Sequence, residues 1–504
     1  MRIPHQEATS PRRAVLVGTA AAIRELEPRL NAVGIQVESD ARLVIDAAKA
    51  RPEDFEQVLE SIILNHQPDL GLITLPARFA GLLDRLRTVL RRLEVPDRFV
   101  PVLEDLLAGI GPRNLPTIDP SDLLDRPAHP LDHQGIRTLC HGRRVLVTGA
   151  GGSIGGELIR RIAGYGPSEL ILMDRSEQAL FEIDRQVARR HPELKRRASL
   201  QDVAERAGTL RVFESCRPNV VLHAAAHKHV PLSEDHPREA VRNNLQGSIS
   251  AVQAAAATGA KTFVLVSTDK AVAPRSVMGA TKRLAEVAVQ RYAAEAGLAT
   301  AVVRFGNVLG SSGSVLEIWQ REVADGGPLT LTDRRMTRYL MTISEAAGLV
   351  LQAASQASSD GPVGRVHVLD MGEPVRILDL AHRFALANGL RLQGIDDVPA
   401  GDSALGLGIV ETGIRPGEKL AEILSHPGDE LSPTGHSAIR TWDGLVPSLP
   451  EIEALMRLTT STDGTSSEVV IEGLRRAVAR LDRMPRRGSE ADGGLEFAAT
   501  FGGG

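Results

Sequence analysis

The chain has 504 residues, of which 42% are apolar and 24% charged, and this balance excludes a wholly disordered chain, a collagen-like repeat and a disulfide scaffold. Lys and Arg total 59 against 63 Asp and Glu, a net charge of −4, which argues against an extended nucleic-acid-binding surface. The two cysteines, Cys140 and Cys216, fit a reducing compartment. No run reaches the roughly 18 apolar residues of a membrane span, and the start lacks the apolar core of a secretory signal. We therefore expect a soluble, cytoplasmic protein.

The first third of the chain predicts an α/β domain. A polar tail, residues 1–11, precedes short apolar runs such as AVLVG and LGLITLP, which alternate with amphipathic stretches such as 55–66 and 79–93. This alternation is typical of a parallel sheet with crossover helices. A proline-rich stretch then closes the domain, so we predict a Rossmann-like accessory domain over 12–132.

A second α/β series follows, and we assign it to 136–485. Its strand-like runs are RRVLVTG, ELILMD, NVVLHAA, KTFVLVST and ATAVVRFGN. The region 310–425 is richer in Gly and Pro and would suit a smaller substrate-binding part, and 447–485 is expected to be helical. We expect 486–504 to be a disordered tail. The predicted fold class is thus α/β with two Rossmann-like parallel-sheet domains.

A glycine-rich turn opens the second domain. Gly149, Gly152 and Gly155 form G-x-x-G-x-x-G between a predicted strand and a helix that starts with Ser153 and Ile154. Such a turn lets backbone and helix N-terminus approach a pyrophosphate. The next strand ends in Asp174, where a carboxylate would hold ribose hydroxyls, while Arg175 would equally meet a 2′-phosphate. We predict a dinucleotide site, with NAD and NADP both open.

A second polar cluster follows the strand KTFVLVST. Thr268, Asp269 and Lys270 come at the carboxyl end of this strand, where parallel sheets place ligands, and Lys282 follows twelve residues later at the start of a predicted helix. Two lysines, a carboxylate and a hydroxyl suit acid–base chemistry coupled to hydride transfer. A solvated loop with an ordinary Asp-Lys ion pair is the alternative.

Several motifs together resemble one family. TGAGGSIG, HAAAHKHVPLSEDHP, VSTDKAVAPRSVMGATKR, VRFGNVLGSSGSV and RPGEKLAEIL are similar to the extended short-chain dehydrogenase/reductases of bacterial polysaccharide biosynthesis, the UDP-N-acetylglucosamine 4,6-dehydratases. The similarity spans roughly 136–430. Larger members carry a second Rossmann-like domain preceded by transmembrane helices, which this sequence lacks. The resemblance implies a tightly bound, recycled NAD or NADP, a UDP-sugar substrate and a homo-oligomer.

The resemblance also implies roles for the polar cluster. The sugar would be oxidised at C4, would lose water across C5 and C6, and would regain the hydride at C6. Lys270 would be the base at C5, Asp269 the acid at C6, Thr268 the partner of the C4 oxygen, and Lys282 the ligand of the nicotinamide ribose. An adjacent lysine ammonium favours an ionised carboxylate, whereas an acid must start protonated, so only burial would favour a neutral pair.

Met278 stands four residues before Lys282, where the family usually has a catalytic tyrosine. A thioether cannot act as a base, so Lys270, Asp269 or a water relay would take the C4 hydroxyl proton. Larger members also resemble this sequence in having Met there. A 4- or 5-epimerase and a non-catalytic nucleotide-sugar-binding protein remain the alternatives.

The remaining candidates come from the same motifs. We predict further cofactor contacts at Asp202, Val203, Ala224, Ala225 and Ala226, and substrate contacts at Lys228, Asn307, Arg338 and Arg415. Arginine suits a pyrophosphate because its planar fork binds two oxygens at once. The histidines of HAAAHKH do not share one helical face, so no metal site is predicted.

Overall fold

The computed structural model describes most of both predicted domains. The described residues are 12–32, 35–45, 52–75, 80–100, 120–124, 126, 129–325, 327–361, 364–388, 390–393, 406–426, 429–442, 450, 453–454, 457 and 466–483. The predicted tails at 1–11 and 486–504, and most of the helix predicted near 447–460, lie outside them.

The chain divides into two compact units. Unit 1 comprises 1–125, 318–334 and 377–412, and unit 2 comprises 126–317, 335–376 and 413–504. Two stretches from the region predicted to bind substrate are thus grouped with the N-terminal residues. The predicted domain limits, 12–132 and 136–485, remain a prediction.

Unit 1 contains a parallel sheet in the order β2-β1-β4-β5, with β3 also pairing with β1. The elements of this part are β1 (Arg12–Gly18), α1 (Ala20–Ala32), β2 (Ile35–Gln36), β3 (Arg42–Val44), α2 (Pro52–His66), β4 (Leu70–Thr74), α3 (Ala80–Arg92) and β5 (Asp97–Phe99). Apolar residues alternate along β1 between two cores, with Val15 and Val17 in one and Leu16 in the other. Sheet faces that are both covered require this continuous apolar run.

The later stretches of unit 1 form a three-stranded sheet in the order β13-β19-β18. The elements here are the end of α13 (Val315–Ala324), β13 (Leu329–Leu331), α15 (Ile377–Ala387), β18 (Arg391–Gln393) and β19 (Gly406–Glu411), and η2 (Pro120–Leu123) ends the described part of the first stretch. Trp319 on α13 packs against Phe384 on α15, with ring centroids 5.5 Å apart. Within the unit, Arg87 pairs with Asp97 at 2.6 Å and donates to the carbonyl of Ala387 at 3.3 Å.

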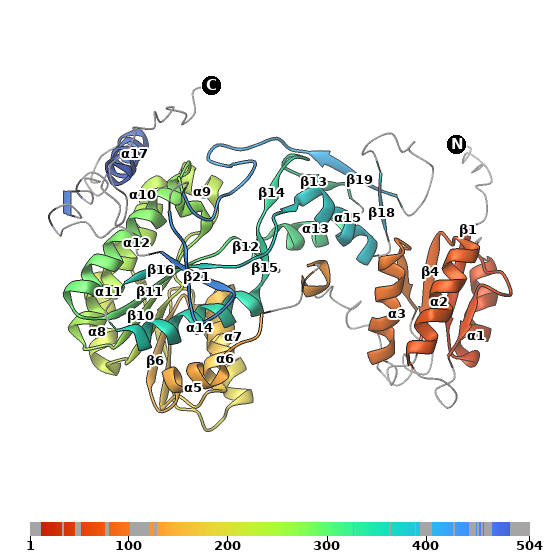
Figure 1. Cartoon of the computed structure of the whole chain (residues 1–504), viewed down its shortest axis with the longest axis horizontal. Helices are drawn as coiled ribbons and strands as arrows, with labels where there is room; N and C mark the ends of the chain where they lie inside the picture. The colour runs from red at the N-terminus through yellow and green to blue at the C-terminus, as the bar shows by residue number, and fades with distance from the viewer. Residues whose placement is uncertain are drawn as a thin grey trace, which may run out of the picture. The chain divides into compact units, whose positions relative to one another are not determined.

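Unit 2 is built on a nine-stranded sheet in the order β20-β21-β16-β11-β10-β9-β6-β7-β8, visible edge-on in Figure 1. Its strands are β6 (Arg144–Thr148), β7 (Glu169–Asp174), β8 (Arg196–Leu200), β9 (Val220–His223), β10 (Thr262–Val266), β11 (Ala299–Arg304), β16 (Arg365–Leu369), β20 (Ser432–Pro433) and β21 (Ile439–Trp442). All pairings are parallel except those of β20 and β21. Strands β7 and β8 lie on one side of β6, and β9, β10 and β11 lie on the other. The boundary between β6 and β9 is therefore a topological switch point, and sheets of this kind bind ligands at such a point.

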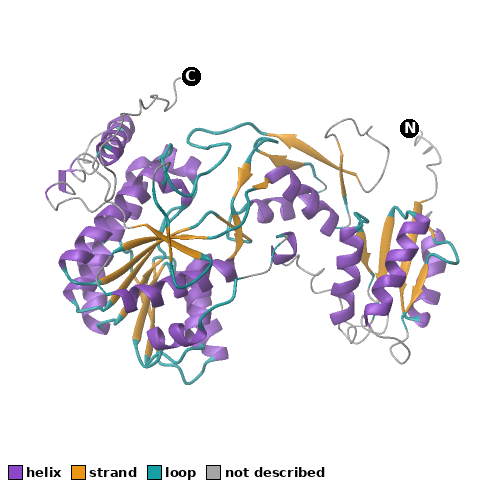
Figure 2. Cartoon of the chain, in the orientation of Figure 1, coloured by secondary structure: helices purple, strands orange, loops and turns teal. Residues whose placement is uncertain are grey.

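Helices cover both faces of this sheet (Figure 2). One core contains residues of α8 (Arg206–Cys216), α11 (Gly247–Ala257), α12 (Val277–Glu295) and α17 (Ser467–Asp482). The other contains residues of α5 (His133–Cys140), α6 (Ser153–Ala163), α7 (Glu177–Arg190) and α14 (Ile343–Asp360). The short elements are α9 (Val230–Asp235), α10 (Pro237–Ala240), the π-helix η3 (Val241–Gln246), η4 (Asp269–Ala271), and the pairs β12 (Asn307–Leu309) with β15 (Leu340–Thr342) and β14 (Thr337–Arg338) with β17 (Val375–Arg376). The predicted α/β fold class is confirmed.

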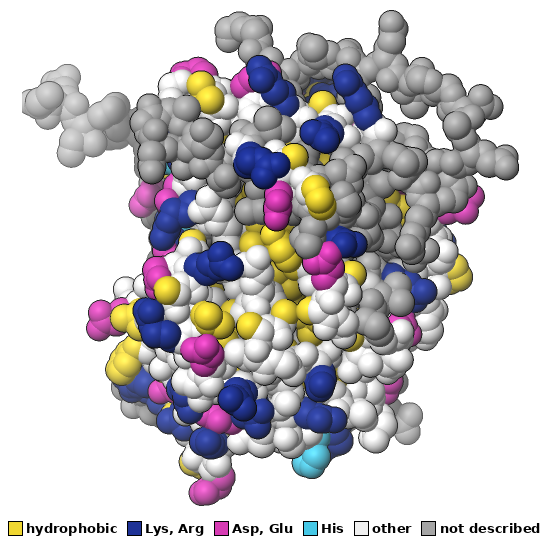
Figure 3. All heavy atoms as spheres, turned by 90° about the vertical axis from the view of Figure 1, so that its left-hand side faces the viewer, with side chains coloured by type: hydrophobic (Ala, Val, Ile, Leu, Met, Phe, Trp, Pro, Cys, Tyr) yellow, Lys and Arg dark blue, Asp and Glu magenta, His cyan; other side chains and the backbone are white. Residues whose placement is uncertain are grey.

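Charges of both signs are interspersed over the described part of one face, as Figure 3 shows. Within the described ranges, no helix has the length and apolar character that a membrane span requires.

Candidate functional site

The glycine turn after β6 has the geometry of a phosphate cradle. Gly149 has φ +66°, and a Cβ there would lie 2.8 Å from the backbone of Ala224, while a Cβ on Gly155 would lie 2.0 Å from the carbonyl oxygen of Gly149. Gly152 caps α6 without any side-chain hydrogen bond, which leaves the first backbone N–H groups of the helix to a ligand. The sequence therefore needs glycine at 149 and 155, and the turn fits a pyrophosphate group.

Other residues that are predicted to contact the cofactor lie around this turn. Ser153 and Ile154 form the first turn of α6, and the Ser153 hydroxyl accepts from the N–H of Ser312 at 3.0 Å. The predicted wall residues Ala224, Ala225 and Ala226 follow β9 directly.

At the predicted adenosine end of the site, the two candidate side chains have hydrogen-bond or ion-pair partners within the protein. Asp174 accepts from the N–H of Gly151 at 2.8 Å and from that of Ser176 at 2.9 Å. Its neighbour Arg175 contacts His227 and lies 3.7 Å from Glu239. The structure therefore fixes Asp174 at the turn and gives Arg175 partners within the protein.

Asp202 and Val203 lie at the end of β8. Asp202 accepts from the N–H of Ala204 at 2.9 Å and from Arg242 at 2.7 Å. Burial raises the pKa of Asp202, but these two hydrogen bonds, together with the positive charges of Arg242 and Arg175, outweigh it and leave the pKa below its usual range. Val203 is buried beneath Gly247.

The second cluster joins four predicted residues at the carboxyl end of β10. Thr268 donates from Oγ1 to Oδ1 of Asp269 at 2.9 Å, and Lys270 donates from Nζ to the same oxygen and to Oδ1 of Asn307, both at 3.0 Å. The Asp269 side chain is fully buried, and its Oδ2 has no hydrogen-bond partner among the described residues. Asn307, predicted as a substrate contact, is thus also a partner of Lys270.

Oδ1 of Asp269 accepts the hydrogen bonds of both Thr268 and Lys270, so Oδ2 is the carboxyl oxygen without a donor among the described residues. Gly306 lies against this oxygen, since a Cβ there would be 3.0 Å away.

Lys282 and Met278 lie on the first turns of α12. Lys282 donates from Nζ to the carbonyl oxygen of Val266 at 2.7 Å, and burial lowers its pKa to about 8 although nearby Glu286 raises it. Met278 is buried, 3% exposed, so it offers packing and no titratable group. A Cβ on Gly279 would lie 2.3 Å from the carbonyl oxygen of Lys270, so glycine allows α12 to pack against η4.

The predicted substrate-binding residues differ in burial and in the partners that they already have within the protein. Lys228 donates to Oγ of Ser311 at 3.1 Å, and burial lowers its pKa. Arg415 is exposed and pairs with Glu418 at 2.9 Å. Arg338 is buried and donates to the carbonyl oxygens of Thr337, Lys419 and Leu420, which occupies two of its nitrogens with backbone. 

Sequence reasoning missed a buried group beneath this cluster. Ser267, Arg283, Glu286 and Arg304 form a hydrogen-bonded set, and His223 joins Thr148 and Ser248. Helical spacing was the available signal, because Glu286 follows Lys282 by four residues and so lies on the same face of α12.

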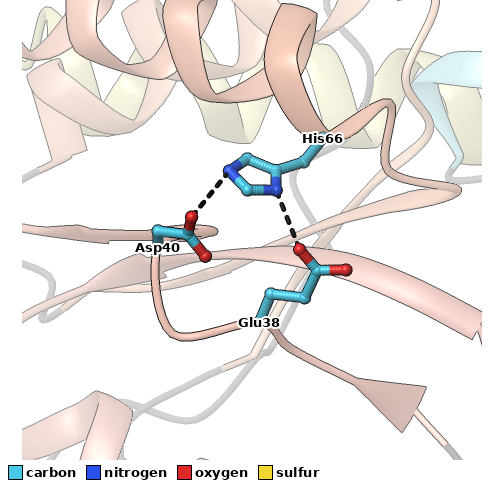
Figure 4. Close-up of side chains that lie close together, drawn as sticks. All are labelled: Glu38, Asp40 and His66. Atoms are coloured by element: carbon cyan, nitrogen blue, oxygen red, sulfur yellow. Dashed lines mark hydrogen bonds and ion pairs between the residues drawn. The ribbon is translucent and has the colours of Figure 1, made fainter.

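Three possible metal ligands, Glu38, Asp40 and His66, meet in unit 1 (Figure 4). His66 Nδ1 lies 3.0 Å from Glu38, and its Nε2 lies 3.6 Å from Asp40. Because each ring nitrogen faces a different carboxylate and one ion would take only one of them, the imidazole is better described as a bridge between two carboxylates.

The glycine turn at a switch point of a doubly wound sheet defines a Rossmann-type α/β protein. The family model described as polysaccharide biosynthesis protein matches residues 145–443, more than half of the chain. The chain belongs to this family. The resemblance drawn from the motifs is confirmed.

Two similar proteins are consistent with membership of this family. The chain is 41% identical over 328 residues to the capsular polysaccharide biosynthesis protein CapD of Staphylococcus aureus, which covers 64% of this chain and 52% of CapD. It is 30% identical to a UDP-N-acetylglucosamine 4,6-dehydratase (inverting) of Campylobacter jejuni, over 57% of this chain and 79% of that protein. The chain therefore spans about half the length of CapD and most of the length of the dehydratase.

Among solved structures, Pen from Bacillus thuringiensis aligns with a TM-score of 0.51 and 25% identity, covering 62% of this chain and 91% of that one.

Proposed function

We propose that this chain is a nucleotide-sugar 4,6-dehydratase that converts UDP-N-acetylglucosamine to a UDP-4-keto-6-deoxy sugar with a tightly bound NAD or NADP. The observation that carries the proposal is the Thr268–Asp269–Lys270–Asn307 cluster at the carboxyl edge of the sheet. It brings together a carboxyl group, an amine and a hydroxyl at the same edge of the sheet as the glycine turn. The Campylobacter relative named as such a dehydratase supports the choice of reaction.

The glycine turn, Asp174 and Lys282 would hold the cofactor. The nicotinamide group supplies the removal and return of a hydride when it is bound. The Lys282 amine, fixed by the carbonyl oxygen of Val266, would face the nicotinamide ribose. Asp174, fixed by the N–H groups of Gly151 and Ser176, would face the adenosine ribose.

The proton steps fall to two side chains. Asp269 receives the C4 hydroxyl proton through Thr268, whose hydroxyl already donates to Asp269, and this replaces the tyrosine absent at Met278. The carboxyl that results is the acid that protonates the departing C6 hydroxyl, which leaves as water. Lys270 removes the C5 proton and returns a proton to C5 at the end, and in D₂O this hydrogen is deuterium because the amine exchanges its hydrogens with solvent. Both residues finish in their starting states, so no outside proton donor is needed.

The deciding experiment is incubation of the full chain with UDP-N-acetylglucosamine, NAD or NADP, and a substrate deuterated at C4. A dehydratase gives a product lighter by one water that keeps the deuterium, now at C6. Reaction in D₂O then adds one deuterium, at C5. A product of unchanged mass assigns the chain as an epimerase, and the absence of any product with several UDP-sugars assigns it as a nucleotide-sugar-binding protein. Either result overturns the proposal.

A further inference from the structure

A buried ion network lies directly beneath the proposed catalytic cluster. Glu286 on α12 accepts from Ser267 Oγ at 2.6 Å, from Arg304 at 2.8 and 2.6 Å, and from Arg283 at 3.2 Å. Its side chain is 0% exposed, and those of Arg283 and Arg304 are 3% and 2% exposed. Trp442 on β21 stacks against both guanidinium groups, each 5.4 Å from its ring centroid. We call these five residues the Glu286 network.

Burying the charged groups of this network costs free energy. Three charges are withdrawn from water, and apolar residues of similar volume often serve a fold equally well or better. Burial raises the pKa of Glu286, but the two guanidiniums outweigh it and hold the pKa at about 2, so Glu286 is a carboxylate at any physiological pH. A permanently ionised group at this depth points to a use of its charge or of its geometry.

The network reaches the proposed site at two points. Ser267, whose hydroxyl it binds, directly precedes Thr268 and Asp269, so the end of β10 is tied to α12 and β11. Glu286 also lies one helical turn after Lys282 and raises the pKa of that amine against the larger effect of burial.

The other titratable groups around Lys282 and the network do not duplicate this effect. His223 on β9 faces Lys282, but burial lowers the pKa of His223 to about 3, so the imidazole is neutral. Arg283 and Arg304 are cationic, and Asp482 on α17 acts on Arg283. The structure therefore assigns the favourable charge near Lys282 to Glu286.

We propose that Glu286 is a positioning residue, which holds the Ser267–Lys270 segment after β10 in register with α12 and places a carboxylate one helical turn from Lys282. The proposal rests on the proposed function for its effect on catalysis, whereas its effect on cofactor binding is independent of which sugar reaction the chain performs. Glu286 itself touches neither substrate nor cofactor in this account.

The test compares Glu286→Gln with Glu169→Gln in the full chain. Glu169 is a matched control, a nearly buried carboxylate with two cationic partners, Lys195 and Arg197, at the opposite edge of the sheet. Glu286→Gln should lower kcat for UDP-N-acetylglucosamine by about tenfold or more, with KM within about twofold, because a charged hydrogen-bond partner of the strand end is lost. NADH titrations over a range of pH, monitored by fluorescence, should show the NADH affinity of Glu286→Gln decreasing at a lower pH than that of the wild type. The reason is that Lys282 would lose its proton at a lower pH in this variant.

A second variant separates the geometry from the charge. Ser267→Ala keeps the Glu286 carboxylate but cuts the link to the strand end, so kcat should fall by about threefold to tenfold while the pH dependence of NADH affinity stays unchanged. This variant decides the geometric part if Glu286→Gln does not fold. The proposal is overturned if folded Glu286→Gln keeps the wild-type kcat and pH midpoint, if Glu169→Gln produces the same losses, or if Ser267→Ala has wild-type kcat. A wild type that binds NADH yet converts no UDP-sugar would instead overturn the proposed function, and the NADH titrations would still test the Glu286 charge.

Discussion

In the proposed mechanism, Asp269 takes up one proton and later releases it. Its Oδ1 already accepts from Thr268 and Lys270, whereas the buried Oδ2 accepts from no described residue. An amide at this position preserves the shape but has no acidic proton, and an alanine at Lys270 removes the proposed base.

We expect Asp269→Asn and Lys270→Ala each to lower the rate of water loss by about 10²–10⁴-fold. The affinity for NADH should stay within about threefold of the wild type, since neither side chain contacts the glycine turn. Product formation by mass spectrometry and NADH binding by fluorescence, on the same preparations, check both statements. Near-normal turnover in either variant would refute the assigned roles.

We predict that Asp174 favours NAD over NADP. Its carboxylate is fixed by two backbone N–H groups at the turn, where it would repel a 2′-phosphate, and the guanidinium of Arg175 already has His227 and Glu239 as neighbours. We expect NADH to bind more tightly than NADPH by about tenfold or more, and Asp174→Ser to narrow this gap mainly by weakening NADH. Parallel fluorescence titrations measure both constants. Equal affinities in the wild type would show that Arg175 turns toward the phosphate.

At the scale of single elements, close packing of α12 on η4 depends on Gly279. A methyl group there would lie 2.3 Å from a backbone carbonyl oxygen, and backbone cannot move aside as a flexible side chain can. Gly279→Ala should therefore destabilise the protein by about 1–3 kcal/mol and lower kcat, because Lys270 would be displaced from Asn307.

Gly156 on α6 provides the matched control for this prediction. A Cβ there meets only ordinary contacts, the nearest being the end of the flexible Arg160 side chain at 3.4 Å. Gly156→Ala should be neutral or stabilising by up to about 1 kcal/mol, because alanine is the better helix former. Urea unfolding of the two variants and the wild type gives the comparison. Equal stabilities would mean that the η4 turn yields to the added methyl group.

The elements were easier to predict than their side-chain contacts. The runs before Gly149 and Asp174 predict β6 and β7, and the glycine spacing predicts the turn and the start of α6, because these are local properties of the backbone. The antiparallel strand β21 was not predicted, since its pairing with β16 joins segments some seventy residues apart and depends on tertiary packing.

The same difference between local and long-range features applies to the residues of the site. Thr268, Asp269 and Lys270 are adjacent in sequence, so their proximity could be predicted. The partner of Lys270 could not, because Asn307 comes from another strand. Arg338 stays a predicted substrate contact, but its bonds to the carbonyl oxygens of a distant segment could not be predicted from its motif.

For the molecule as a whole, two buried histidines predict loss of stability in acid. Burial lowers the pKa of His223 to about 3 and that of His367 to about 4, from an ordinary value of 6.5. Below pH 6.5 the unfolded chain takes up these two protons, whereas the folded chain does not until the pH approaches 4 and then 3. The stability is therefore complete above pH 6.5 and declines as the pH falls through this window.

Each unit of pKa separation corresponds to about 1.4 kcal/mol, so each histidine should remove roughly 3 kcal/mol from the free energy of unfolding by pH 4. Urea unfolding at pH 7 and pH 4, monitored by tryptophan fluorescence, measures this loss. His223→Gln and His367→Gln are each expected to be less stable than the wild type at pH 7 but to lose less on acidification, because glutamine takes up no proton. If both variants lose as much stability as the wild type between the two pH values, other groups than these histidines govern the acid sensitivity of unit 2.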